Sequence, residues 1–140
     1  MITAKFPRNK VRKLLEEQSR GIVSICEARL YKIGKESIEH ARLSRAYTDI
    51  SGNLRSSISF CVARNGSISR IAPRKVFLNG EEGAYRAERL LEKLAASSGS
   101  SPTLYIVAAM PYARYVEATG RDVTISATIL AERLINQSRR

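Results

Sequence analysis

A helical pattern that runs from about Lys10 to Tyr47 is the feature that most constrains the fold of this 140-residue chain. Apolar residues recur along it at helical spacings, and polar Gln18 interrupts their stripe. A helix this long with so narrow a stripe is unusual in a small monomer, so we expect part of it to contact another subunit. The stripe consists of Val11, Leu14, Leu15, Ile22, Ile25, Cys26, Leu30 and Ile33, and Ile38 and Ala41 continue it.

Two glycines lie inside this helical pattern. Gly21 and Gly34 each cost a helix about 1 kcal/mol relative to alanine. They mark a bend or a close crossing with another element, and Gly34 is the position at which the helix is most easily divided in two. Before the helix, Pro7 opposes helical structure, so residues 1–9 are predicted to be a flexible basic arm.

The region after the helix predicts a β-hairpin. Residues 47–53 (YTDISGN) have the composition of a turn. Residues 54–63 alternate between two faces, which predicts a half-buried strand that is antiparallel to its neighbour. An Asn-Gly pair in residues 64–67 favours a tight hairpin turn, and residues 68–78 are predicted to form a return strand that a proline interrupts.

Four further elements are predicted in the second half of the chain. They are a helix over 81–98, a central strand over 103–110, a short helix over 112–118 and a final helix over 124–138. The final helix is predicted to bury Ile125, Ile129, Leu130 and either Leu134 or Ile135.

The order of these elements predicts an α+β fold. A long N-terminal helix comes first, a small and mainly antiparallel sheet is covered by helices, and a C-terminal helix ends the chain. Residues 1–140 are predicted to form a single domain, with variable loops over 64–80 and 97–102.

The sequence offers no recognisable set of catalytic or metal-binding residues. His40 is the single histidine and lies among charged helical residues, which predicts a solvated side chain. Cys26 falls on an apolar helix face and Cys61 in a strand, so we expect small buried thiols, with a disulfide as the alternative. No nucleotide-binding glycine motif and no HExxH motif is present. We therefore expect no enzymatic activity, no metal and no cofactor.

The formal net charge of +11 is the strongest signal in the composition. It favours nucleic acid, acidic protein surfaces or anionic lipid as partners. Residues 50–80 contain five basic residues and no acid, and four of these are candidate contacts to nucleic acid or to an acidic partner: Arg64, Arg70, Arg74 and Lys75. Aromatic residues do not interleave with them as in a base-stacking platform. The longest uncharged stretch is too rich in serine, glycine and proline to predict a membrane span.

Two motifs occur in the order found in a known family. Ser51, Gly52, Asn53, Leu54, Arg55, Ser57 and Ile58 fit the pattern T-G-N-L-R-x-S-I, with serine in the place of threonine. Tyr112, Ala113, Tyr115, Val116, Glu117 and Gly120 fit the pattern Y-A-x-Y-V-E-x-x-G. Together with the long helix, residues 10–135 resemble the tail-completion, or head–tail joining, family of minor structural proteins in tailed bacteriophages. Residues 63–101 carry no part of this resemblance.

The resemblance implies a non-enzymatic virion protein at the neck or at the top of the tail, assembled in the host cytoplasm. Proteins of this family form rings, usually six-fold, between the portal-side connector and the tail tube. The implied partners are further copies of the chain and the virion proteins of connector and tail, with non-specific contact to packaged DNA as an additional expectation. A basic nucleic-acid-binding module is the alternative interpretation, since charge by itself does not separate the two.

The motif residues are candidates for assembly contacts. We expect Gly52 to adopt an unusual φ angle and Asn53 to tolerate the left-handed region. Arg55 is predicted to form an ion pair with Glu117 or with an acid of a neighbouring subunit. Tyr112 and Tyr115 lie three residues apart, on one face of a helical turn, and are predicted to anchor the corner between the central strand and the last helix.

Overall fold

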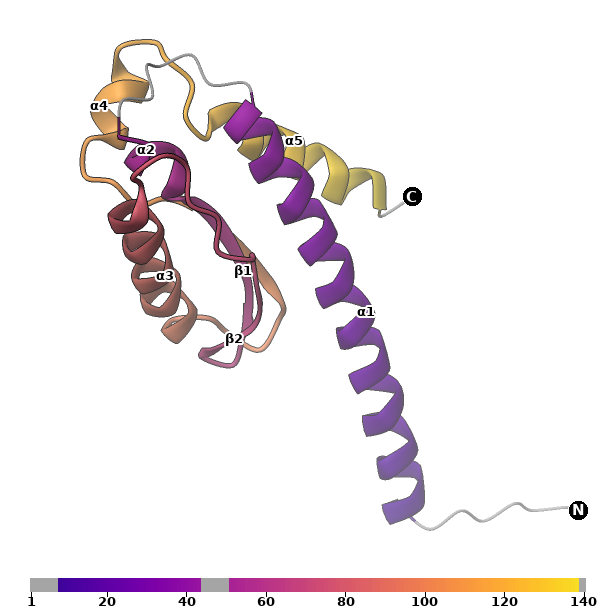
Figure 1. Ribbon diagram of the computed structural model, residues 1–140. Helices are drawn as coiled ribbons and strands as arrows, with labels where there is room; N and C mark the ends of the chain where they lie inside the picture. The colour runs from indigo at the N-terminus through magenta and orange to yellow at the C-terminus, as the bar shows by residue number, and fades with distance from the viewer. Residues whose placement is uncertain (1–7, 44–50, 139–140) are drawn as a thin grey trace, which may run out of the picture.

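The computed structural model describes residues 8–43 and 51–138, and these residues form an α+β arrangement, as predicted. A long N-terminal helix precedes a three-stranded antiparallel sheet, and further helices follow (Figure 1). The elements are α1 (Arg8–Leu43), α2 (Asn53–Ser56), β1 (Ile58–Arg64), β2 (Ser67–Ile71), α3 (Glu81–Ala96), β3 (Thr103–Ala108), α4 (Ala113–Ala118) and α5 (Ile125–Ser138).

The sheet has the strand order β2-β1-β3, and both pairs of neighbours are antiparallel. The predicted hairpin turn is confirmed, because Asn65 and Gly66 have φ angles of 55° and 79°. The prediction that residues 103–110 form the central strand is wrong: β3 lies at an edge, and β1 is central. An apolar run on an edge strand is explained by helix packing, since β3 contacts both α1 and α3.

The strand β1 is buried on both faces, so the prediction of a half-buried strand is also wrong. Ile58 and Phe60 lie in a core cluster with residues of α1, α4 and α5. Cys61 and Ala63 lie in a second cluster with α3 residues such as Leu91. The period-two pattern therefore separates two helix-covered faces rather than a core face from a solvent face.

Two predicted boundaries of the hairpin change in the structure. Residues 53–56 form the short helix α2 rather than the start of a strand, because the Ser56 N–H donates to the Gly52 carbonyl at 2.8 Å in a helical turn. The return strand ends at Ile71, before Pro73, and residues 72–78 contain no further strand. The helix predicted over 81–98 is confirmed as α3.

The helix α1 passes through Gly21 and Gly34 without a break. A Cβ atom added at Gly34 would lie 2.4 Å from the Phe60 ring, so this glycine permits the close crossing of helix and sheet rather than a division of the helix. The helix begins at Arg8, two residues inside the segment predicted to be a flexible arm; residues 1–7 and 44–50, which include the predicted end at Tyr47, lie outside the described part of the chain.

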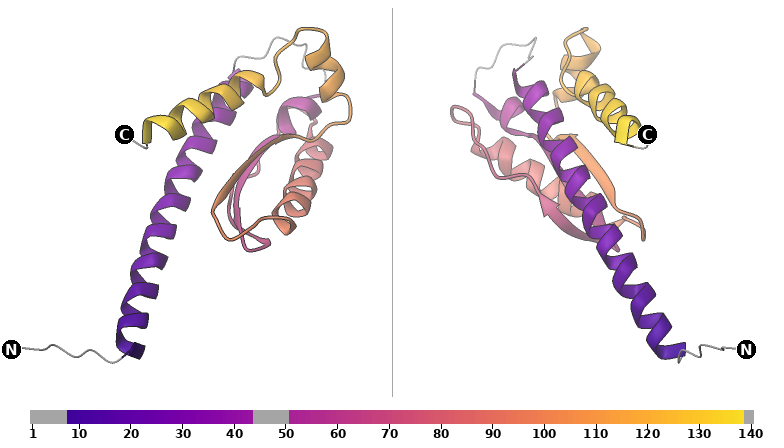
Figure 2. Two further views of the ribbon diagram at one scale, coloured as in Figure 1. Left: turned by 180° about the vertical axis from the view of Figure 1, so that it is seen from behind. Right: turned by 90° about the vertical axis from the view of Figure 1, so that its right-hand side faces the viewer.

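The two halves of α1 have different environments. Residues 30–43 pack against β1 and α5, and Ile38 and Ala41 are buried there. Residues 8–26, which we call the projecting half, extend past the hairpin and away from the remainder of the molecule (Figures 1 and 2). Cys26 is exposed there, contrary to the prediction of a buried thiol. The exposed large apolar residues of this half are Val11, Leu14, Leu15, Ile22 and Ile25.

The last helix, α5, crosses the C-terminal half of α1 (Figure 1). Its buried residues are the small Ala127 and Ala131, which bring the two helix backbones close together. Ile125 and Ile129 are 54% and 61% exposed, so their predicted burial is wrong. Leu130, Leu134 and Ile135 are partly buried, so the predicted burial holds in part for these larger residues.

Candidate assembly site

The first motif forms a tight turn that holds α2 against the segment before α3. Gly52 has a φ of 78°, which confirms the expected unusual conformation. A Cβ atom on this residue would lie 1.8 Å from the Phe77 carbonyl oxygen. The neighbouring backbone is joined to the same segment, because the Asn79 N–H donates to the Ser51 carbonyl at 3.0 Å. Glycine is therefore required here both by φ and by contact distance.

Asn53 has a different role from the one predicted. It is the first residue of α2 and does not adopt the left-handed conformation; within residues 8–43 and 51–138, the non-glycine residues that do are Asn65 and Leu78. Its Oδ1 accepts a hydrogen bond from the Gly83 N–H at 3.2 Å. Gly83 lies in the first turn of α3, where backbone N–H groups lack helical partners. Asn53 thus joins the first motif to the start of α3.

Arg55 faces Phe77, so the predicted ion pair with Glu117 is not formed, and the alternative partner, an acid of a neighbouring subunit, stays a prediction. The guanidinium carbon of Arg55 lies 3.9 Å from the centre of the Phe77 ring. Arg42 and Lys75 approach the same ring at 5.4 Å and 5.2 Å, which makes Phe77 a common acceptor of cation–π contacts. Sequence reasoning missed Phe77, because it lies in a loop and in neither motif. Its position two residues after Lys75 is the signal that was available.

Glu117 is an internal acceptor at the end of α4. Its Oε1 accepts hydrogen bonds from the Thr124 N–H at 2.8 Å and from the Thr124 hydroxyl at 2.9 Å. Thr124 immediately precedes α5, and Gly120, with a φ of 83°, turns the chain back between them. A carboxylate at a helix N-terminus is favoured by the helix dipole. Glu117 therefore fixes the start of α5, in place of the predicted contact to Arg55.

The two tyrosines of the second motif point outward. Tyr112 is 40% exposed and Tyr115 is 73% exposed, so they do not anchor the corner by packing on the sheet. Ala113 and Val116, from the same helical segment, pack against the core instead. The short helix α4 has its apolar inner side built from small residues, which leaves both aromatic rings available on the surface.

Two of the four candidate basic residues of the hairpin region have acidic partners in three dimensions. Arg64 lies 3.5 Å from Glu27 of α1, and Arg74 lies 3.3 Å from Glu88 of α3. The expectation of an uncompensated basic surface is therefore wrong for these two residues: their partners are distant in sequence. Arg70 is exposed on the edge strand β2, and Lys75 faces Phe77.

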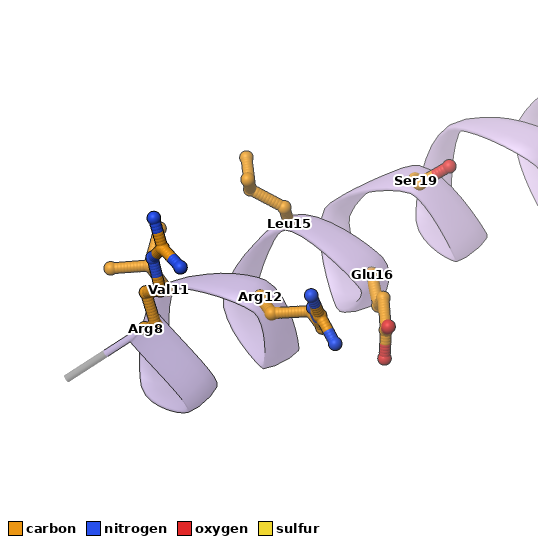
Figure 3. Close-up of a pocket in the computed structure, with 6 residues that line it drawn as sticks. All are labelled: Arg8, Val11, Arg12, Leu15, Glu16 and Ser19. Atoms are coloured by element: carbon orange, nitrogen blue, oxygen red, sulfur yellow. The ribbon is translucent and has the colours of Figure 1, made fainter.

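The tip of the projecting half combines charge with exposed apolar side chains. Arg8, Val11, Arg12 and Leu15 border one shallow groove on the helix surface, shown in Figure 3 together with Glu16 and Ser19. The first turn of this helix carries no acidic residue, although a helix N-terminus favours one. This end of the molecule is therefore strongly positive.

The described residues present little chemistry beyond these surfaces. They contain no group of three or more His, Cys, Asp and Glu side chains that could hold a metal ion. Burial raises the pKa of the Cys61 thiol from 9.0 to about 11, so the thiol stays protonated. Among the helices that the structure describes, none is both long enough and apolar enough to cross a membrane.

Comparison of the chain with protein-family models, curated proteins and solved structures finds no match. The candidate residues fall into two spatial groups. Gly52, Asn53 and Glu117 fix the ends of helices, so they stabilise the fold of the subunit itself. Tyr112, Tyr115 and the projecting half of α1 present apolar side chains at the surface, where another protein can reach them.

Proposed function

We propose that this chain is a non-enzymatic structural component of a tailed-bacteriophage virion. It forms a ring, six-fold in symmetry, at the head–tail junction or at the top of the tail, and joins the connector to the tail. The observation that carries this proposal is the projecting half of α1, in which Leu15 and Ile22 are 61% and 62% exposed. Such side chains are expected to be covered by another protein, because exposed apolar surface is costly in water.

The two sequence motifs support the proposal through their structural roles. Gly52 and Asn53 connect α2 to α3, and Glu117 connects α4 to α5. Residues that fix helix ends in this way give a rigid body, which a ring subunit needs in order to repeat the same contact around an axis. Tyr112 and Tyr115 remain exposed on that body. Tyrosine is enriched at protein interfaces, so both are candidates for contact with a neighbouring protein.

The charge is compatible with the same location. A ring between the connector and the tail surrounds the path of the genome, and a net charge of +11 favours contact with a polyanion. Since Arg64 and Arg74 are paired with acids, the excess charge lies on other residues, which include exposed Arg70. This distribution favours weak, non-specific contact over a dedicated nucleic-acid site.

The test is the position of the protein in an intact virion map, together with particles assembled without it. We expect density at the neck or the upper tail, and filled heads with unjoined tails when the protein is missing. A map that places the protein elsewhere, or joined and infectious particles without it, would contradict the proposal.

The alternative function is a basic nucleic-acid-binding module, which the net charge and the positive tip of α1 favour. A gel-shift titration of labelled duplex at increasing salt distinguishes the two. A stable monomer that binds duplex with a steep salt dependence supports the alternative. A ring-sized oligomer that is indifferent to duplex argues against it.

A further inference from the structure

The exposed apolar stripe of the projecting half is a separate surface and not a continuation of the core face of α1. Glu27, which contacts Arg64 and Ser69 of the hairpin, marks the side of the helix that faces the sheet. Ile22 lies five residues before Glu27, which corresponds to about 140° around the helix axis. The stripe therefore points away from the side that α1 uses within its own subunit.

The spacing along the stripe is that of a helix that packs on another helix. Val11, Leu15, Gln18, Ile22 and Ile25 are separated by four, three, four and three residues, which is the repeat of a coiled-coil seam. After Ile25 the next positions of this repeat are charged, beginning with Arg29. The seam thus ends where α1 reaches the remainder of the subunit.

We infer that the seam is filled by the same helix of neighbouring copies, packed in parallel with Gln18 level with Gln18. Coiled-coil helices in parallel register place like positions together, so each Gln18 amide meets a second amide that can both donate and accept. In an antiparallel pair, Gln18 would face Leu15 or Ile22, and its amide would be buried without a partner. The polar residue in the seam therefore selects a parallel partner of identical sequence.

The flanks of the seam permit this arrangement. All but one of the positions beside it are uncharged, so that like charges do not oppose one another there: Leu14, Ser19, Gly21, Cys26 and Ala28. A Cβ atom added at Gly21 would meet nothing within 4 Å, so this flank is open for a neighbour. Arg12 is the one charged residue at a flanking position of the seam, near the basic tip.

The area of the stripe indicates more than two copies. A half-exposed aliphatic side chain loses roughly 30–60 Å² of apolar surface when it is covered, so two stripes that each contain Val11, Leu15, Ile22, Ile25 and the flanking Leu14 bury roughly 300–600 Å². A stable specific interface buries about 1,200 Å² or more. A single pair falls short of this, whereas in a ring each helix also buries its flanking side chains against a second neighbour. The inference deepens the proposed ring and rests on it, by naming the surface through which the copies meet.

A pair of matched variants tests the inference by sedimentation velocity over a wide concentration range. Leu15→Glu with Ile22→Glu introduces two charges into the seam, and Asn9→Glu with Ser24→Glu introduces the same charge at exposed positions outside it. We expect the seam variant to associate at least about tenfold more weakly than the wild type, because buried charges are strongly disfavoured. The control variant should associate like the wild type. Circular dichroism of both variants checks that the body stays folded.

The salt dependence of self-association provides an independent test of parallel packing. Parallel packing brings together the basic tips, which contain Arg8, Lys10, Arg12 and Lys13. Added salt should therefore strengthen self-association, because it screens this repulsion. Association that is mediated by nucleic acid weakens with salt instead, and that result would contradict the inference.

Cross-linking tests the parallel register. In a Cys26→Ser background, Gln18→Cys should form a disulfide between copies on treatment with diamide, since equal positions lie level. Ser24→Cys in the same background, outside the seam, should not. Buried Cys61 remains unreactive in both.

The outcomes separate this inference from the proposed function. A wild-type oligomer that persists in the seam variant overturns the inference and leaves the ring proposal in place. A wild-type protein that is monomeric at every concentration and salt level also overturns the inference, whereas the ring proposal is decided by the virion map. The inference is supported if the seam variant dissociates, the control variant does not, and Gln18→Cys forms the cross-link.

Discussion

The two halves of α1 belong to one uninterrupted helix, yet they differ in almost every property that tertiary structure confers. In the half that packs on the sheet, Ile38 is 2% exposed and Gly34 lies under the Phe60 ring. In the projecting half, Ile22 is 62% exposed and Gly21 has nothing near it. The same residue types thus stabilise the fold in one half and create a surface in the other. Apolar periodicity predicts that a helix face will be covered. It does not show whether the cover is the chain's own sheet or another protein.

The largest contrast is expected in the reactivity of the two cysteines. Cys26 in the projecting half is exposed, and Cys61 in the central strand is buried. Near neutral pH we expect a maleimide to label Cys26 faster by about a thousandfold or more, because Cys61 becomes accessible only when the body opens. Mass spectrometry of timed samples measures this. Equal labelling rates would show that the sheet and the helices covering it open too readily to protect Cys61.

The same thiol predicts a loss of stability in alkali. The folded pKa of Cys61 is about 11, which is above the unfolded value of 9.0. The stability that the protonated thiol contributes is therefore fully present below the pKa of the unfolded state. It is lost as the pH rises through the pKa of the folded state. Denaturation at several pH values in this range should show a larger loss of stability for the wild type than for Cys61→Ala.

Truncation of matched isoleucines gives the largest expected difference in the free energy of unfolding. Ile38→Ala should lower it by about 2–5 kcal/mol, because the change leaves a cavity in the core. Ile22→Ala should change it by no more than about 0.5 kcal/mol, because an exposed side chain loses little on truncation. Urea denaturation of dilute protein measures both. Similar losses for the two variants would remove the distinction between the halves.

The two glycines should respond to alanine with opposite signs. Gly34→Ala places a Cβ atom against the Phe60 ring and should destabilise by about 1–3 kcal/mol. Gly21→Ala meets no neighbour and should stabilise by about 0.5–1 kcal/mol through its higher helix propensity. Thermal unfolding of the two variants checks this. Destabilisation by Gly21→Ala would indicate that the projecting half is already covered by another copy.

The second motif shows the same contrast between stabilising and exposed residues. Glu117 stabilises the start of α5, whereas the two tyrosines of the motif are exposed. Glu117→Gln should lower the free energy of unfolding by about 0.5–2 kcal/mol, because Thr124 loses a charged acceptor at the start of α5. Glu117→Lys should lower it further, through repulsion by the helix dipole. Glu132→Gln, at an exposed position of α5, is the control for loss of charge. Impaired assembly without any loss of stability would restore a direct contact role for Glu117.

The smallest effect is expected at the boundary between the halves. Glu27→Gln weakens the ion pair with Arg64 and the hydrogen bond with Ser69, and it should destabilise by up to about 1 kcal/mol. Glu16→Gln, in the projecting half, should have no measurable effect. High salt should reduce the difference between the two variants, because a partly exposed ion pair is screened. A difference that does not change with salt would point to packing rather than charge.

Local patterns in the sequence predicted most elements and few of their contacts. The long helix, the Asn-Gly turn, α3 and α5 follow from periodicity and turn chemistry between near neighbours in the chain. The order of the strands does not, because edge and centre depend on which helices cover each face. For this reason the apolar run of residues 103–110 predicts a central strand, although β3 lies at the edge of the sheet. The predicted burial of Ile125 and Ile129 fails for a similar reason: α5 packs on α1 through Ala127 and Ala131, which allow a closer crossing of the two helices.

The candidate site divides in the same way. The sequence by itself predicted an unusual φ angle at Gly52, because a glycine in a turn can adopt conformations that other residues rarely adopt. Only the tertiary structure decided that Arg55 faces Phe77, that Glu117 accepts from Thr124 and that Arg64 meets Glu27. Hydrogen bonds and ion pairs act over a few ångströms, so they depend on how distant segments are brought together. The sequence thus set the helices and turns of this protein, and the packing of α1 against the sheet decided which of its surfaces remain exposed.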